Sequence, residues 1–288
     1  MQRRIFGSVV VVAAGLLPAL IGGPIFALLM VGIGIIALRE FLTLGREIVA
    51  PGTHWSLYAS LILVACGALF SQSILLFLAV LLGAFAPLVI SLRYTNAPSA
   101  AETWTWGLAG ACYVGLPVYA AIALRQTAGN DVSSAWHTLA DRLALGWAPA
   151  AAGMAWVLAV VLSTWAGDSA AYLVGRAFGR HKLARAVSPG KTIEGALGGL
   201  LAAVVVSAAV FRMSGALPTW AGALVGTGLG VFGQLGDLSE SFLKRQAGVK
   251  DSGTLIPGHG GMLDRVDALL FAFPAALLMY WITEGVLR

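Results

Sequence analysis

The chain has 288 residues, of which 59% are hydrophobic and only 11% are charged, and its mean hydropathy is +0.87. This balance lies far outside that of soluble domains and places the chain in a lipid bilayer. The net charge of +5 does not indicate a nucleic-acid partner, because no basic stripe with interleaved aromatic residues is present. Anionic lipid or phosphate is the expected partner.

The first 24 residues have the positive start and apolar middle of a signal peptide, but they lack a clear A-x-A cleavage site. They are therefore expected to remain as a first membrane span. A spanning helix needs about 20 mostly apolar residues, and this rule predicts an all-α polytopic membrane protein with nine transmembrane helices. The predicted spans are residues 5–21, 24–42, 55–70, 72–92, 103–125, 147–175, 192–213, 217–243 and 262–285.

The positions of the basic residues predict how these spans are oriented. With a cytoplasmic N-terminus, 14 of the 18 lysines and arginines fall on the cytoplasmic side, and only Arg125, Arg142, Arg212 and Arg288 fall on the other. This distribution follows the positive-inside rule. We therefore expect a multi-pass protein of the plasma or inner membrane, with the polar C-terminal loops in the cytoplasm.

The two halves of the chain differ in their polar content. Residues 1–146 contain N-terminal helices joined by chemically plain connections, and residues 125–146 predict an extracytoplasmic connection with a partly amphipathic helix. Residues 147–288 hold the polar clusters and are expected to form catalytic helices and cytoplasmic loops. No repeat or low-complexity linker separates the halves, so residues 1–288 are expected to form a single integrated membrane domain.

The first polar patch covers residues 163–183. Asp168 stands inside an apolar run, where an ionised carboxylate costs about 2.5–3.5 kcal/mol unless a partner offsets it. On a helix, Asp168 shares one face with Tyr172, Gly175 and Arg176. The patch therefore predicts either a binding site or a structural ion pair, such as one between Asp168 and Arg176.

The second patch is "SPGKTIEG", residues 188–195. Pro189 and Gly190 are expected to make a turn, which leaves Lys191 and Thr192 at the start of the next helix. Free backbone N–H groups and the helix dipole favour an anion there. The spacing does not match a Walker A loop. Lys191 is thus expected either to bind phosphate or to serve as an interfacial anchor.

The third patch joins the last two predicted spans. Gly222, Gly226 and Gly230 recur every fourth residue and form a face for close helix packing, and the same face continues to two carboxylates. Two more carboxylates lie at the start of the next helix. The four are Asp237, Glu240, Asp264 and Asp267. Carboxylates that converge repel one another unless a cation neutralises them, and oxygen ligands suit Mg²⁺. A salt-bridge network of Asp237 with Arg265 and Lys244 is the structural alternative.

A glycine-rich basic loop, "QAGVKDSGTLIPGHGG", connects these two helices and contains Lys250 and His259. Its glycines allow tight turns that bring backbone N–H groups against a ligand. A metal held by carboxylates beside such a loop is typical of phosphoryl or nucleotidyl transfer, in which cations absorb developing charge.

Residues 241–267 resemble the signature of phosphatidate cytidylyltransferases, also called CDP-diacylglycerol synthases. The matching positions are Ser241, Lys244, Arg245, Lys250, Asp251, Gly253, Pro257, His259, Gly260, Gly261, Asp264, Arg265 and Asp267. The similarity extends over residues 163–285, whereas the first 146 residues match only in being hydrophobic and multispan. The chain departs from its relatives at Ala170, Gly190 and Ile193, where they commonly have glycine, lysine and tryptophan.

This resemblance implies that CTP and phosphatidate react to give CDP-diacylglycerol and pyrophosphate with Mg²⁺, the presence of a second cation being left open. It also implies a role for each candidate residue. The expected metal ligands are Asp237 and Asp264, with Asp267 and Glu240 as further ligands or supporting groups. The expected phosphate-binding residues are Lys191, Lys250 and Arg265, and those that orient nucleotide or ligands are Asp168, Ser241, Asp251 and His259. Small-residue faces also permit the homodimer that relatives are thought to form.

Three other classes of function are compatible with parts of the sequence. A cation transporter would also use intramembrane carboxylates, but it needs polar residues through the whole membrane thickness, whereas these gather at one border. A CTP-using enzyme acting on a polyprenyl or ether-lipid phosphate would share the metal and nucleotide chemistry. A purely structural membrane scaffold would leave the basic loop unexplained.

Overall fold

The computed structural model describes residues 16–45, 49–93, 100–128, 132–145, 147, 150–253 and 260–287. Almost all of them are helical. After a helical stretch at residues 16–21, the elements are α2 (Gly23–Leu44), α3 (Thr53–Leu69), α4 (Ser73–Ser91), α5 (Ala100–Arg125), α6 (Ser134–Leu143), α7 (Ala151–Phe178), β1 (Lys182–Ala184), β2 (Ser188–Thr192), α8 (Ile193–Ser214), α9 (Thr219–Gln246) and α10 (Leu263–Leu287). The expected helix in the connection before residue 146 is present as α6.

Within the described residues, six helices are long and apolar enough to cross a bilayer: α2, α4, α5, α7, α8 and α10. They confirm an all-α, multi-pass membrane protein. Helix α3 is apolar but has 17 residues, and α9 is not among the six. The predicted first span, residues 5–21, lies mostly outside the described residues. The count of nine spans and the cytoplasmic N-terminus therefore stay predictions.

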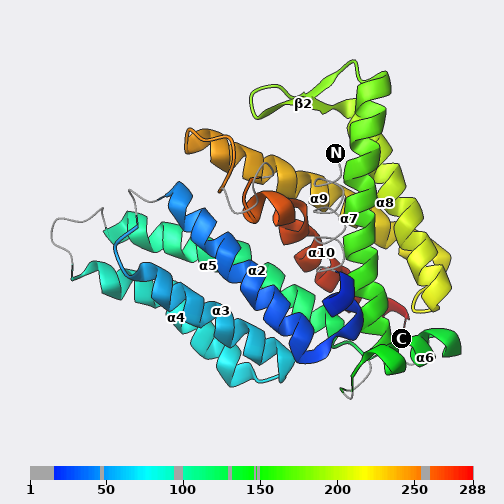
Figure 1. Ribbon diagram of the computed structural model, residues 1–288, viewed down its shortest axis with the longest axis horizontal. Helices are drawn as coiled ribbons and strands as arrows, with labels where there is room; N and C mark the ends of the chain where they lie inside the picture. The colour runs from blue at the N-terminus through cyan, green and yellow to red at the C-terminus, as the bar shows by residue number, and fades with distance from the viewer. Residues whose placement is uncertain are drawn as a thin grey trace, which may run out of the picture.

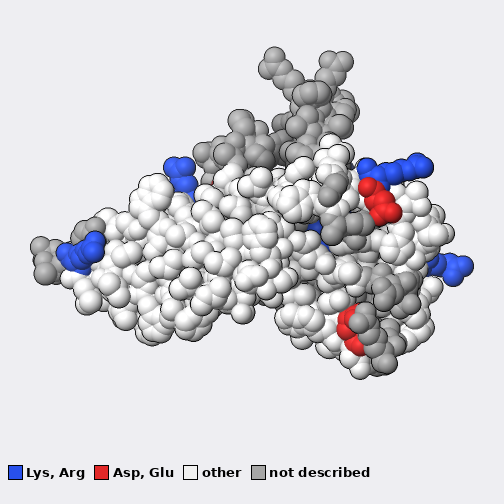
Figure 2. All heavy atoms as spheres, turned by 90° about the horizontal axis from the view of Figure 1, so that it is seen from below, with Lys and Arg blue, Asp and Glu red and all other residues white. Residues whose placement is uncertain are grey.

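The surface agrees with a membrane environment. Figure 2 shows one face of the molecule on which lysine, arginine, aspartate and glutamate are few and lie mostly near its outline. Large apolar side chains are exposed on the helices, including Leu28 at 71%, Val80 at 63% and Leu201 at 65%. Lipid tails are the solvent that such side chains require.

Helix α10 lies between two groups of helices, α2 to α5 on one side and α7 to α9 on the other (Figure 1). It contributes to both apolar cores. In one core, Leu263 and Leu270 pack with Leu38 and Val114 of the N-terminal helices. In the other, α10 packs with α7, α8 and α9, and the core centres on Trp156. The N-terminal helices are thus tied to the C-terminal ones through α10, and α5 also contacts α7 directly.

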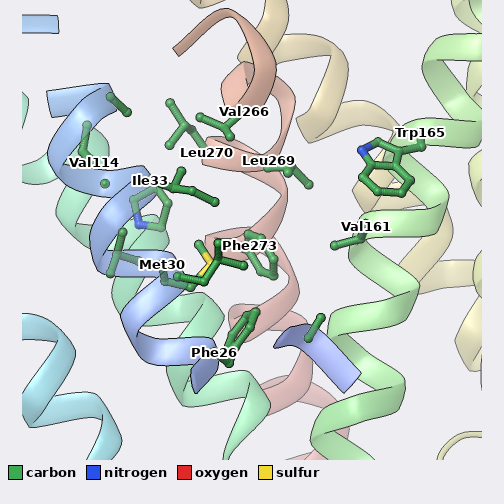
Figure 3. Close-up of a pocket in the computed structure, with 16 residues that line it drawn as sticks. Phe26, Met30, Ile33, Val114, Val161, Trp165, Val266, Leu269, Leu270 and Phe273 are labelled. Atoms are coloured by element: carbon green, nitrogen blue, oxygen red, sulfur yellow. The ribbon is translucent and has the colours of Figure 1, made fainter. Parts of the chain in front are cut away.

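A small apolar cavity of about 80 Å³ lies at this junction, between α2, α5, α7 and α10. Figure 3 shows that Phe26, Met30, Trp165 and Phe273 face it from these elements. Every residue that lines it is apolar or glycine. The cavity therefore belongs to the packing of the two halves and offers no group for chemistry.

The predicted small-residue face of α9 packs against α8. A Cβ on Gly226 would lie 2.7 Å from the Ala203 carbonyl oxygen, and Gly222 and Gly230 meet α8 in the same way. Further along α9, a Cβ on Gly236 would lie 2.5 Å from the carbonyl oxygen of Asp267 on α10. These close contacts with α8 and with α10 place the C-terminal turns of α9 beside the starts of both helices.

The segment between α7 and α8 corrects one prediction. The expected turn at Pro189 and Gly190 is wrong, because both residues lie in β2, which pairs antiparallel with β1, and the turn covers residues 185–187. A two-stranded hairpin has only edge strands, so a proline without an N–H group is tolerated there. Thr192 then caps α8, its hydroxyl accepting a hydrogen bond from Gly195 N at 3.1 Å.

Arg125, the last residue of α5, contacts the segments that precede α2 and α7. Arg125 is only 3% exposed, and its guanidinium donates to the carbonyl oxygens of Ala19 and Leu20, both at 2.7 Å, and of Ala150 at 3.1 Å. Gly22 has φ +76°, and a Cβ there would collide with this guanidinium. Arg125 thus ties the end of α5 to the segments that precede α2 and α7.

Candidate functional site

A polar cavity of about 430 Å³ opens where the end of α7, the β-hairpin, the start of α8 and the C-terminal half of α9 meet. Asp168, Tyr172, Gly175 and Arg176 all line it, which confirms that they share one face of α7. Arg176 Nη1 donates to Tyr172 Oη at 3.3 Å. Asp168 is exposed and belongs to the lining of this cavity.

An ion pair crosses this cavity. Lys191 Nζ on β2 lies 2.5 Å from Asp237 Oδ2 on α9, and the two side chains are 27% and 30% exposed. The Asp168 carboxylate interacts electrostatically with both members of this pair: Asp237 repels it and Lys191 attracts it. We call Asp168, Lys191 and Asp237 the first charge cluster. Because it is partly exposed, a charged ligand can compete for its lysine and its carboxylates.

A second charge cluster lies one turn further along α9 and consists of Glu240, Lys244 and Asp264. Lys244 Nζ lies 2.5 Å from Glu240 Oε2 and 2.5 Å from Asp264 Oδ1. The side chains of Lys244, Glu240 and Asp264 are 13%, 0% and 7% exposed. Lys244 thus pairs with a carboxylate from each helix and holds the end of α9 against the start of α10.

The surrounding backbone also holds Asp264 in place. Its Oδ2 atom accepts hydrogen bonds from Ser252 N at 2.9 Å, from Ser252 Oγ at 2.9 Å and from Gly261 N at 2.7 Å. Both sides of the glycine-rich loop, where the structure describes it, therefore converge on one carboxylate. This is a pre-organised arrangement, because three donors and a lysine determine the position of the side chain.

Asp267 lies between the two clusters. Its charge interacts with those of Asp237, Glu240 and Asp168, and its Oδ1 atom accepts a hydrogen bond from Ala268 N at 2.8 Å. These carboxylates repel one another, and the lysines do not fully offset their negative charge. The site can therefore accept a further cation. Glu240 Oε1 is likewise buried without a hydrogen-bond donor among the described residues.

The arrangement differs from the expected one, in which four carboxylates surround one ion. In the part of the chain that the structure describes, no group of three or more His, Cys, Asp and Glu side chains is placed to hold a metal. Of the residues in the expected salt-bridge alternative, Lys244 pairs with Glu240 and Asp264, and Asp237 pairs with Lys191. The oxygen donors nevertheless fit Mg²⁺, which proteins usually bind through one or two carboxylates together with substrate phosphates.

The remaining predicted residues lie outside the first charge cluster. Lys250, Asp251 and Arg265 are exposed, and Ser241 is half-buried on α9. None of these residues lines the polar cavity. His259 falls outside the described residues.

The sequence analysis missed Glu40, Ser252 and Gln234. Glu40 comes from α2, yet it accepts hydrogen bonds from Met262 N at 3.0 Å and Leu263 N at 2.7 Å at the start of α10. Gln234 lines the polar cavity and donates to the Ala196 carbonyl oxygen at 3.0 Å. A glutamate inside an apolar predicted span is the same signal that singled out Asp168, and it would have found Glu40.

Comparison with known protein families connects this geometry to a group of enzymes. The sequence model of the cytidylyltransferase family matches residues 1–283, almost the whole chain. The chain belongs to this family. The match includes the first 146 residues as well as the C-terminal half.

The similar relatives are bacterial. The phosphatidate cytidylyltransferase of Staphylococcus haemolyticus is 47% identical over 123 residues, which cover 42% of this chain and 47% of that relative. The phosphatidate cytidylyltransferases of Staphylococcus epidermidis and Staphylococcus aureus are 48% identical over 124 residues and 46% identical over 123 residues, with the same coverage of 42% and 47%. The chain thus spans about half the length of the relatives that it matches.

Proposed function

We propose that this membrane protein transfers the cytidylyl group of CTP to phosphatidate, giving CDP-diacylglycerol and pyrophosphate. The observation that carries the proposal is the partly exposed Lys191–Asp237 ion pair, which lines a polar cavity of about 430 Å³ together with Asp168. A triphosphate is the kind of ligand that such a cavity suits, because its charge can replace Asp237 as the partner of Lys191. The family and the names of the relatives point to CTP and phosphatidate.

The protein has to supply little covalent chemistry in this reaction. An oxygen of the phosphatidate phosphate attacks the α-phosphorus of CTP, a new P–O bond forms, and the bond to the β-phosphate oxygen breaks as pyrophosphate leaves. The protein must align the two phosphates and neutralise the charge that develops. In this proposal Lys191 and Arg176 meet the triphosphate at the cavity wall, and the second charge cluster holds α10 and its carboxylates in place.

We assign the divalent ion to the first charge cluster. Asp237 is the proposed ligand, with Asp168 and Asp267 as the neighbouring carboxylates whose charges already interact with it. Bound Mg²⁺ would supply charge neutralisation at the phosphate oxygens. Two or three protein oxygens are enough in this case, because the substrate phosphates complete the coordination. Asp264, which is already paired with Lys244, is the less direct candidate.

We further propose that the site faces the cytoplasm of a cell membrane. The distribution of basic residues supports this orientation, and CTP is a soluble substrate that must reach the cavity from water. Phosphatidate would present its phosphate at the same membrane border. Lys191 lies just before α8, and Lys244 and Asp264 lie at the end of α9 and the start of α10, so these charges are grouped near helix ends. This grouping favours an interfacial reaction over transport through the bilayer.

The test is to incubate purified protein in lipid vesicles with labelled CTP, Mg²⁺ and separate lipid phosphates. The expected product is a CDP-lipid that forms with phosphatidate and is accompanied by one pyrophosphate. A product that formed only with a polyprenyl phosphate or an ether-lipid phosphate would overturn the proposed substrate. Ion flux across the same vesicles without nucleotidyl transfer would overturn the proposed reaction class.

A further inference from the structure

A buried carboxylate from the N-terminal half, Glu40, reaches the region of the second charge cluster. Glu40 lies near the end of α2 and is only 8% exposed. Its Oε1 atom accepts a hydrogen bond from Met262 N at 3.0 Å, and its Oε2 atom accepts one from Leu263 N at 2.7 Å. These two amides open α10, so the glutamate occupies the positive end of that helix dipole.

Ser252 connects Glu40 to Asp264. Its hydroxyl oxygen lies 3.1 Å from Glu40 Oε2 and 2.9 Å from Asp264 Oδ2, and its backbone N donates to the same Asp264 atom at 2.9 Å. A hydroxyl has one proton and can donate to only one of the two carboxylates at a time. Glu40 and Asp264 are therefore linked through one shared side chain.

The backbone around Glu40 has no space for larger residues. A Cβ on Gly253 would lie 2.5 Å from Glu40 Oε1, and a Cβ on Gly261 would meet Glu40 Oε2 and Ser252 Oγ. Two glycines of the basic loop are thus needed because of a side chain more than 200 residues earlier in the chain. Removing a buried carboxylate from such a pocket would leave two helix-start amides unpaired.

We propose that Glu40 is a positioning residue for the catalytic half of the protein. It holds the start of α10 and Ser252, and through them it sets the position of Asp264 and its partner Lys244. The N-terminal helices thereby determine the geometry of the second charge cluster without contributing to the polar cavity. The expected effect on turnover rests on the proposed cytidylyl transfer, whereas the effect on the backbone of α10 does not.

Two measurements on the full chain in lipid nanodiscs test this assignment with the variants Glu40→Ala and Glu40→Gln. The first is hydrogen exchange of the Met262 and Leu263 amides. Glu40→Ala should speed their exchange at least tenfold, and Glu40→Gln should do so by a smaller factor, because its amide keeps one acceptor oxygen. The matched control is Asp141→Asn, which changes an exposed carboxylate on α6 and should leave this exchange unaltered.

The second measurement separates turnover from nucleotide binding. We expect kcat for CDP-lipid formation to fall at least 30-fold in Glu40→Ala and three- to tenfold in Glu40→Gln, with the KM for CTP changed less than twofold. The KM should hold because the Lys191–Asp237 pair lies outside the contacts that Glu40 makes. A purely structural role would instead lower the amount of folded enzyme and leave kcat per active molecule unchanged.

Normal kcat in a folded Glu40→Ala protein would overturn the positioning role, and so would unchanged exchange at Met262 and Leu263. If Glu40→Ala does not fold, Glu40→Gln carries the same two comparisons, and Ser252→Ala tests the effect on kcat alone. If the unsubstituted protein makes no CDP-lipid, the proposed function fails. The exchange rates then still decide whether Glu40 holds the start of α10.

Discussion

The N-terminal and C-terminal helices hold their buried charges in different ways. In α2 to α5, Arg125 donates to three backbone carbonyl groups, and Glu40 accepts from two backbone amides. In the β-hairpin and in α9 and α10, the lysines pair with carboxylate side chains: Lys191 with Asp237, and Lys244 with Glu240 and Asp264. Backbone partners cannot move away, whereas a side-chain partner can be exchanged for a ligand.

The two kinds of buried charge have different roles: one kind fixes the packing of helices, and the other takes part in the proposed reaction. A buried charge satisfied by the backbone fixes where helices meet, because moving it would leave several polar groups unpaired at once. A half-exposed ion pair such as Lys191–Asp237 keeps two opposite charges ready beside a cavity. We therefore expect a substitution at Arg125 to affect stability and substitutions in the first charge cluster to affect catalysis. Glu40, which joins α2 to the start of α10, is the exception, because it should act on catalysis through the position of Asp264.

The largest effect is expected from Asp237→Asn. This change removes the charge partner of Lys191 and the proposed ligand of the divalent ion, so kcat for cytidylyl transfer should fall about 10²–10³-fold. The protein should still insert and fold, because the side chain is 30% exposed. Turnover of labelled CTP and thermal unfolding in detergent measure the two outcomes, with Asp141→Asn as the control. Near-normal turnover would remove Asp237 from the proposed site.

A second test concerns Lys191→Ala. Losing one charge-assisted hydrogen bond to a phosphate weakens binding by about 1.5–3 kcal/mol, so the KM for CTP should rise roughly 10- to 100-fold. Lys182→Ala is the matched control, because Lys182 is an exposed lysine of the same hairpin. Unchanged KM and kcat in Lys191→Ala would make this residue an interfacial anchor only.

A third test uses two glycines to compare the packing of the halves. Gly226→Ala places a Cβ against the backbone of Ala203 and Val204 and should lower the free energy of unfolding by about 1–3 kcal/mol. Gly32→Ala on α2 is the control, since a Cβ there has no atom within 4 Å. Chemical denaturation in detergent measures both. Equal stabilities would show that α8 and α9 can separate without loss.

The smallest effect is expected from Arg125→Lys. A lysine cannot reproduce the planar guanidinium that reaches three carbonyl oxygens, so the free energy of unfolding should fall by about 1–2 kcal/mol. Cytidylyl transfer by the folded protein should stay within twofold of normal. Arg142→Lys, an exposed change on α6, is the control. A large loss of kcat without a loss of stability would contradict the separation of the two regions.

Most helices could be predicted from the sequence, because apolar runs of membrane length leave the backbone no alternative to intrahelical hydrogen bonds. The predicted span at 103–125 and α5 differ by three residues at the start and end at the same residue, Arg125. The β-hairpin could not be predicted in this way. Proline and glycine at 189 and 190 indicate a turn locally, but pairing of β2 with β1 decides the conformation.

The candidate site was predictable where its residues lie on one helix or near one another in the chain. The face that carries Asp168, Tyr172 and Arg176 follows directly from helical spacing. The partner of Asp237 did not follow, because Lys191 reaches α9 only after the hairpin folds beside it. The pairing of Lys244 with Asp264 likewise depends on how α9 and α10 approach each other.

Composition and the length of the apolar runs were enough to identify a helical membrane protein, and the positions of the charged residues place most of its polar chemistry in the second half. The resemblance of residues 241–267 to the cytidylyltransferase signature indicated nucleotidyl transfer from the sequence alone. Only the tertiary structure decided which lysine meets which carboxylate, and that Glu40 of the second helix caps the last one. Those contacts join residues far apart in the sequence. A local sequence pattern does not specify which helices pack against each other, so it cannot predict these pairs.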